Sequence, residues 1–211
     1  MIRTRSPAWR GEADTGAKGH SGDKRGEEWC VDVIGNGPGG RLARVSTAEH
    51  ALFVYGTLQF PEVLHQLIGR CPDLSPADLA GWRAAALPGR LYPGLVADAR
   101  ATVRGALLSG LSAGEWAVLD AFEDDEYDLR SVDFGDVVHA DPGVRSSRHR
   151  PEGPDLTARA RYAPGAVWTY VWTADVTPRD WRAEEFAAEH LSAFATRCAG
   201  WRQTLDPRCN S

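Results

Sequence analysis

The sequence predicts an α+β protein: a small mixed sheet curled into a β-barrel, with helices packed on it. Many short apolar segments are bounded by Gly or Pro, whereas only three segments have helical periodicity. Hydrophobic residues make up 43% of the 211 positions, enough for one good core. No internal repeat and no regular strand–helix alternation is present, so a doubly wound parallel sheet is not expected.

The first part of the chain has the composition of a disordered tail. Residues 1–28 are charged, Gly-rich and poor in branched apolar side chains, so they bury too little surface to offset their ordering entropy. Residues 35–40 contain Gly-x-Gly-x-x-Gly, a motif of dinucleotide-binding sites. Residues 41–50 leave little room for the helix that such a site needs, so a linker is the preferred interpretation and a dinucleotide site the weaker alternative. We therefore predict a tail and linker over 1–50 and one domain over 51–205.

The most informative local pattern is a strand followed by a tight turn and a helix. Residues 51–54 are apolar and predict a buried strand, and residues 61–69 begin with Pro, carry an amphipathic pattern and end with Gly, as helices often do. The turn between them consists of Tyr55, Gly56, Thr57 and Leu58. Its backbone N–H groups are expected to face outward at a helix N-terminus, which favours an anion, although many such turns bind nothing.

The remaining elements follow from Gly, Pro and capping residues. Three strands are predicted at 81–87, 90–96 and 102–108, with Gly105 as a bulge or a point of close approach. A capping box, Ser-x-x-Glu, predicts a short helix over 112–122.

The C-terminal half continues the same pattern. Residues 129–138 predict one or two strands, and 141–164 predict a surface loop rich in Pro, Arg and Gly. Residues 166–172 predict a buried strand. A final helix is expected over 177–194, capped by its opening Thr-Pro-Arg-Asp.

An acidic cluster follows the capped helix. Most of its carboxylates are expected to be solvated, but Glu123 differs because it follows Phe122 at the helix C-terminus. The helix macrodipole and the acidic neighbours both disfavour ionisation there, so we predict a raised pKa and a useful proton acceptor near neutral pH. The pattern leaves open whether Glu126 instead of Glu123 faces a cavity.

Other chemistries receive little support. The four cysteines form no Cys-x-x-Cys pair and the six histidines no His-Glu-x-x-His pattern, so we expect neither a zinc site nor a redox motif, and no cofactor. A formal net charge of −5 disfavours nucleic acid as a partner. No apolar run of membrane-spanning length and no apolar leader segment is present, so the expectation is a cytoplasmic protein without a membrane partner.

Three motifs together match a known family. They are Tyr55-Gly56-Thr57-Leu58, then Arg90-Leu91-Tyr92-Pro93, then Leu119-Asp120-Ala121-Phe122-Glu123 with Tyr127 and Arg130 beyond it. In this order they resemble the γ-glutamylcyclotransferase-like family, and most of all its avirulence-induced plant-type branch. The resemblance covers residues 52–202.

The resemblance implies a small β-barrel in which the turn and the glutamate share one cavity. Family members release 5-oxoproline from γ-glutamyl compounds, so Glu123 is implied as the general acid/base. The residues implied in substrate binding are Tyr55, Gly56, Thr57, Leu58 and Tyr127. No cofactor or metal is implied, and the partner is a small γ-glutamyl molecule.

Several neighbouring residues carry weaker expectations. Tyr127 is expected either to contact Glu123 or to pack in the pocket wall, Tyr92 to be structural, and Arg130 to pair with a carboxylate in solvent. Well-characterised branches often have Gly where Asp124 follows the glutamate here, which motivates an alternative: a non-catalytic module that binds an amino-acid-like ligand on the same fold. The oligomeric state is not predicted.

Overall fold

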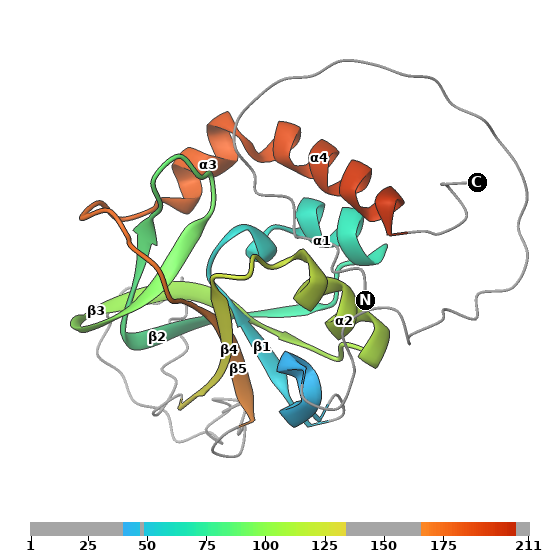
Figure 1. The fold of residues 1–211 in the computed structure, drawn as a ribbon, viewed down its shortest axis with the longest axis horizontal. Coiled ribbons are helices and arrows are strands. Elements are labelled where there is room, and N and C mark those ends of the chain that lie inside the picture. Colours follow the sequence, from blue (N-terminus) through green and yellow to red (C-terminus); the bar gives the residue numbers. More distant parts are fainter. Residues whose placement is uncertain (1–39, 47–48, 134–165, 206–211) are drawn as a thin grey trace, which may run out of the picture.

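The computed structural model describes residues 40–46, 49–133 and 166–205, and they form one mixed sheet with helices gathered along one side (Figure 1). The strands are β1 (Ala51–Val54), β2 (Asp73–Ala86), β3 (Pro93–Ser109), β4 (Tyr127–Val132) and β5 (Val167–Trp172). Their order across the sheet is β2-β3-β1-β5-β4. β1 lies at the centre, antiparallel to β3 and parallel to β5, and the other pairs are antiparallel.

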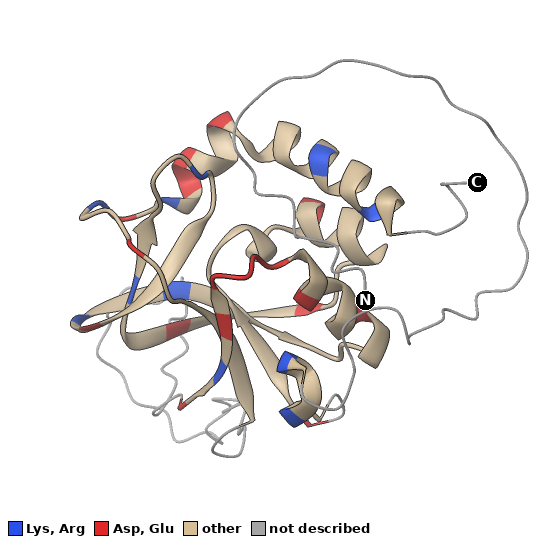
Figure 2. Ribbon diagram, in the orientation of Figure 1, with Lys and Arg blue, Asp and Glu red and all other residues tan. Residues whose placement is uncertain are grey.

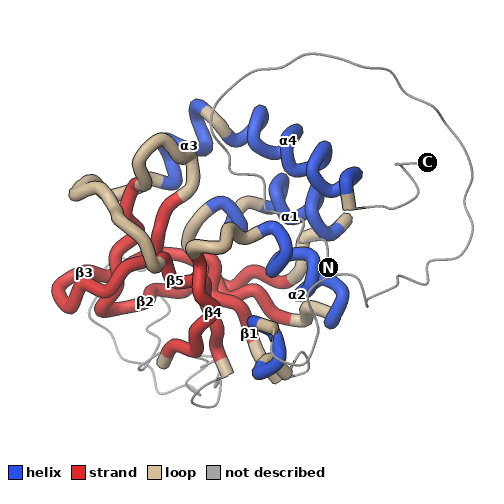
Figure 3. The backbone as a smooth tube through the Cα atoms, in the orientation of Figure 1, coloured by secondary structure: helices blue, strands red, loops and turns tan. Residues whose placement is uncertain are grey.

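The helices of the described residues comprise four α-helices, which lie on one side of the sheet (Figure 3), and two short 3-10 helices. They are the α-helices α1 (Pro61–Ile68), α2 (Ala113–Phe122), α3 (Ala183–Glu189) and α4 (Leu191–Thr204), and the 3-10 helices η2 (Arg41–Arg44) and η3 (Thr57–Gln59). α1 has Pro at its start and ends at Gly69, whose φ of 78° is left-handed, and α2 has the predicted capping box between Ser112 and Glu115. Both helix predictions are confirmed at these ends.

The central strand divides the core in two. All four residues of β1 are buried, and because side chains alternate along a strand, Leu52 and Val54 enter the large cluster beneath the helices while Phe53 enters a second cluster. The buried members of the second cluster come only from strands and from Tyr55, next to β1. Since no helix of the described residues contributes to this second cluster, the sheet itself curls around it.

The α+β class is confirmed, but the predicted barrel does not close. β2 and β4 are both edges, and no strand in the described residues joins them. Instead, residues 177–181 run beside the end of β2, where Thr177 N and Trp181 N donate to the carbonyl oxygens of Ala86 and Ala84 at 3.0 and 2.9 Å. The sheet is therefore a curled, open structure with a short irregular segment on one edge.

The long strands correct the predicted boundaries. The strand predicted at 81–87 starts at Asp73, and the strands predicted at 90–96 and 102–108 are parts of one strand, β3. The bulge lies at Gly81, with φ of 82°, instead of at Gly105. Gly105 is a point of close approach, because a Cβ there would lie 2.3 Å from the Val54 carbonyl oxygen.

The C-terminal region also differs from its prediction. The expected single helix is two, α3 and α4, separated at His190, so there are four α-helices in the described residues instead of three. Residues 177–180 do not cap α3, whose N-cap is Arg182. The predicted strand at 129–138 begins at Tyr127 and ends at Val132, and residues 134–138 lie outside the described residues, as does the predicted loop at 141–164.

Candidate active site

A pocket opens where β1 ends and α2 ends. It is lined by residues 53–58, 92–93, 122–124, Tyr127 and Tyr170. Its empty volume is about 540 Å³, a figure that includes open solvent at the mouth. The structure thus brings together every residue that the sequence placed in the site: Tyr55, Gly56, Thr57, Leu58, Glu123 and Tyr127.

The predicted turn forms one wall of this pocket. Gly56 is the N-cap of the 3-10 helix η3, with no side chain capping it, and the leading N–H groups of such a helix have no acceptor within it. A Cβ on Gly56 would lie 3.0 Å from two ring carbons of Pro93, so a larger residue would push against the opposite wall. The close approach of the Pro93 ring therefore favours glycine at this position.

Glu123 ends α2 and lines the same pocket. It is the C-cap residue, partly buried, and its N–H donates to the Leu119 carbonyl at 3.3 Å. Burial raises the pKa of Glu123 to about 8, Arg41 opposes the rise, and the charges of Asp120 and Asp124 add to it. The raised pKa agrees with the sequence prediction, although burial, which the sequence did not reveal, is the largest cause.

Glu126 lies outside the pocket and belongs to an ion-pair cluster at its edge. The Arg90 guanidinium donates to the Asp124 carboxylate and to the Tyr92 hydroxyl, and its Nη2 lies 3.1 Å from Glu126 Oε1. The Tyr92 hydroxyl donates to Asp124 Oδ2 at 2.9 Å. Burial opposes the ionisation of Asp124, but hydrogen bonds from Glu126, Tyr92 and Arg90 outweigh it and lower the pKa of Asp124. Figure 2 shows this acidic stretch after α2.

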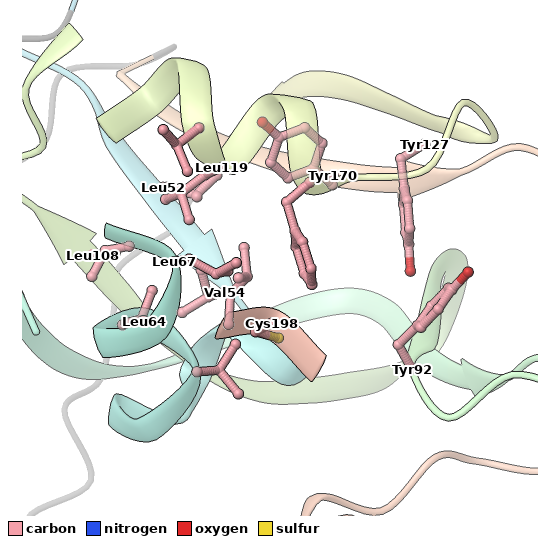
Figure 4. Packing of buried hydrophobic residues seen from close by; sticks show 14 of the residues in the cluster. Leu52, Val54, Leu64, Leu67, Tyr92, Leu108, Leu119, Tyr127, Tyr170 and Cys198 are labelled. Carbon is pink, nitrogen blue, oxygen red and sulfur yellow. The ribbon is translucent and has the colours of Figure 1, made fainter. Parts of the chain in front are cut away.

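Tyrosines form much of the remaining wall, and Figure 4 shows Tyr92, Tyr127 and Tyr170 together at one side of the aliphatic core. The Tyr127 hydroxyl donates to the Pro93 carbonyl, and the Tyr55 hydroxyl donates to the Tyr170 carbonyl at 2.8 Å. Burial raises the pKa of Tyr55, Tyr127 and Tyr170 well above the usual value, so these hydroxyls stay neutral beside Glu123.

Some residues at the site were not predicted to be part of it. Tyr170 lies in a strand that the sequence predicted only as buried, and Tyr92, expected to be structural, lines the pocket. Arg41 lies in the segment predicted as a linker, yet it pairs with Asp120 at 3.0 Å beside the pocket. Arg130 pairs with Asp128 at 2.9 Å in solvent, as expected.

The described residues contain neither a metal-ligand cluster nor a helix suited to span a membrane. No group of three or more His, Cys, Asp or Glu side chains there is arranged to hold a metal ion. Among the helices of the same residues, none combines the length and the apolar character needed to cross a membrane.

Fold and pocket together define a curled α+β protein with a pocket lined by a backbone turn and a partly buried glutamate. The chain belongs to the γ-glutamyl cyclotransferase, AIG2-like family, whose family model matches residues 52–187, more than half of the chain. The match begins one residue into β1 and ends within α3, so it contains the turn and Glu123.

Relatives and solved structures come from Arabidopsis thaliana. AIG2-like protein A is 30% identical over 148 residues, which is 69% of this chain and 76% of that protein. AIG2-like protein C is 44% identical over 86 residues, 41% of this chain, and the match spans half of that protein's length. A solution structure of an Arabidopsis protein matches with 28% identity and a TM-score of 0.45, covering 74% of this chain and 93% of that one.

Proposed function

We propose that the protein is a γ-glutamylcyclotransferase, which releases 5-oxoproline from a γ-glutamyl amino acid or γ-glutamylamine. The observation that carries the proposal is the pocket in which the Gly56-Thr57-Leu58 turn and Glu123 face the same space. Family membership supports cyclotransferase-like activity in general. The identity of the leaving amine is left to experiment.

In the proposed reaction the substrate's α-amine nitrogen attacks its own γ-carbonyl carbon. A new C–N bond closes the lactam ring, and the bond from that carbon to the leaving amine breaks. The α-ammonium nitrogen loses two protons in total and the leaving nitrogen gains both, so the equation needs no other reactant. Because the attack is intramolecular, orientation supplies much of the rate and one proton carrier suffices.

Glu123 is the proposed proton carrier. As a carboxylate it takes a proton from the α-ammonium, and as a carboxylic acid it returns one to the leaving amine. A pKa of about 8 suits both roles near neutral pH, because neither form is scarce. The N–H groups of Gly56, Thr57 and Leu58 are proposed to hold either the α-carboxylate or the developing oxyanion. Tyr55 and Tyr127 contribute shape to the binding wall.

The test is release of 5-oxoproline from a panel of γ-glutamyl amino acids and γ-glutamylamines. Glu123→Gln is expected to lose about 100-fold or more of the activity, because general acid–base catalysis contributes that much. The matched control is Asp125→Asn, which removes a nearby exposed carboxylate that does not line the pocket. Activity that survives in Glu123→Gln at the control's level would refute the mechanism.

A second candidate is a binding module that has kept the pocket and lost turnover. Asp124 favours it, because this residue replaces the glycine expected there and forms an ion pair with Arg90 at the pocket edge. Thermal stabilisation by γ-glutamyl compounds, with no product from any of them, would support this candidate. Any turnover that depends on Glu123 would exclude it.

A further inference from the structure

Arg41, in the segment before β1, contacts the backbone around the site. Arg41, in η2, has an ion pair from Nε to Asp120 Oδ1 at 3.0 Å, with side chains 26% and 14% exposed. Its Nη2 donates to the carbonyl oxygens of Asp120 and Glu123 at 2.7 and 3.4 Å. Its Nη1 donates to those of Asp124 and Tyr127 at 3.3 and 3.0 Å.

These contacts use the whole guanidinium. An arginine carries five N–H donors in a planar fork, and the four on the Nη atoms have four carbonyl acceptors while Nε faces a carboxylate. The acceptors surround the end of α2 and the turn into β4, where a helix leaves carbonyl groups without partners. A lysine has three donors on one atom and does not match this set.

The same side chain ties the pocket wall to the helix. Asp120 Oδ1, which pairs with Arg41, also accepts from the Tyr170 hydroxyl at 3.0 Å, and the guanidinium carbon lies 5.8 Å from the centre of the Tyr170 ring. Tyr170 lines the pocket from β5, on the sheet side. η2, α2 and β5 therefore meet at Arg41.

We infer that Arg41 is a positioning residue of the site: it fixes the backbone around Glu123 and keeps a cation beside that carboxyl group. The working site then includes the segment from residue 40 onward, ahead of the predicted domain start at residue 51. The kinetic part of the inference rests on the proposed function, whereas its structural and titration parts do not.

Electrostatics agrees with this geometry. Arg41 is the cation that opposes the rise in the pKa of Glu123, whereas the other charged groups acting on it are anionic. The charged groups around Glu123 are Arg41 from η2, Asp120 from α2 and Asp124 from the turn after α2. The titratable hydroxyl groups belong to Tyr92, before β3, and to Tyr55, Tyr127 and Tyr170, in the strands or at their ends. Arg90, which pairs with Asp124 and Tyr92 at the pocket edge, remains as a cation beside this set when Arg41 is removed.

Arg44 provides a matched control. It lies in the same 3-10 helix and also anchors it, through a hydrogen bond to the Leu129 carbonyl at 3.2 Å and a position 5.2 Å from the centre of the Trp168 ring. These contacts do not involve the end of α2. If η2 acts only as a structural strap, Arg41 and Arg44 substitutions should have the same effects.

The experiment compares full-length wild type, Arg41→Gln and Arg44→Gln by carbon NMR with the glutamate carboxyls labelled. The Glu123 signal is identified by its loss in Glu123→Gln. Arg41→Gln should raise the pKa of Glu123 by about one unit, because a nearby cation is lost, while Arg44→Gln should leave it in place. This readout needs no activity, so it remains informative if the proposed function fails. An unchanged pKa in Arg41→Gln, or an equal shift in both variants, would overturn the inference.

Arg41→Lys keeps the charge and provides a second test if Arg41→Gln does not fold. Amide hydrogen exchange over residues 123–127 should be at least tenfold faster than in wild type, and unchanged in Arg44→Lys. If the enzyme is active, kcat of Arg41→Lys should fall about tenfold with KM nearly unchanged, since Arg41 is not among the residues that line the pocket. The inference would be overturned if Arg41→Lys had the same amide hydrogen exchange and the same kcat as wild type.

Discussion

Replacing Glu123 with glutamine should make the stability of the protein less sensitive to alkaline pH. In the folded protein the pKa of Glu123 is about 8, whereas the ordinary value is 4.5. The folded state therefore holds this proton more tightly, and the resulting stability is complete below pH 4.5 and is lost as the pH rises through 8. At about 1.4 kcal/mol per unit, the whole loss is about 5 kcal/mol, and glutamine, which does not titrate, avoids it.

The assay is urea unfolding of both proteins at several pH values. The free energy of unfolding of Glu123→Gln minus that of wild type should increase by about 4 kcal/mol between pH 5 and pH 8.5. Taking the difference cancels the titration of all other groups, and the exposed Asp125→Asn serves as the control, expected to stay within about 0.5 kcal/mol. If the difference in the free energy of unfolding between Glu123→Gln and wild type does not change with pH, the raised pKa of Glu123 is refuted.

Three further substitutions test how the fold supports the site. Gly105→Ala should lower the free energy of unfolding by about 3 kcal/mol or more, because its Cβ would meet the Val54 carbonyl oxygen. Gly200→Ala, in α4 with open space around it, should raise that free energy by about 0.5–1 kcal/mol. Thermal melts of the two variants distinguish a steric conflict from a general effect of alanine. Ser112→Ala removes the capping box of α2 and should cost about 1 kcal/mol in urea unfolding, and a loss below 0.3 kcal/mol would contradict the assigned cap.

Local signals in the sequence predicted the parts of the fold that depend on neighbouring residues. The capping box at Ser112, the Pro61 start of α1 and the left-handed Gly69 are each specified within a few residues, and all three are present. The position of Glu123 also follows from local structure, since the length of α2 places it at the helix end. Its burial does not, because burial depends on what the rest of the fold packs around that end.

Features that depend on distant contacts were not predictable. The first half of β2 contains Pro76 and several polar residues, which an edge strand tolerates because one side of its backbone faces solvent. Arg41 is separated by 79 positions from Asp120, so nothing in the residues near it indicates a role at the site. The break between α3 and α4 at His190 has no Pro or Gly to mark it.

The most direct test of Glu123 as the proton carrier is the pH dependence of 5-oxoproline release by wild type and Glu123→Gln. The assay uses the best substrate of the panel. If Glu123 is the proton acceptor, wild-type kcat/KM should rise as the pH increases through about 8, where Glu123 becomes the carboxylate. This rise should be absent in Glu123→Gln. The same rise and the same rate in both proteins would contradict it, because the base would then be another group.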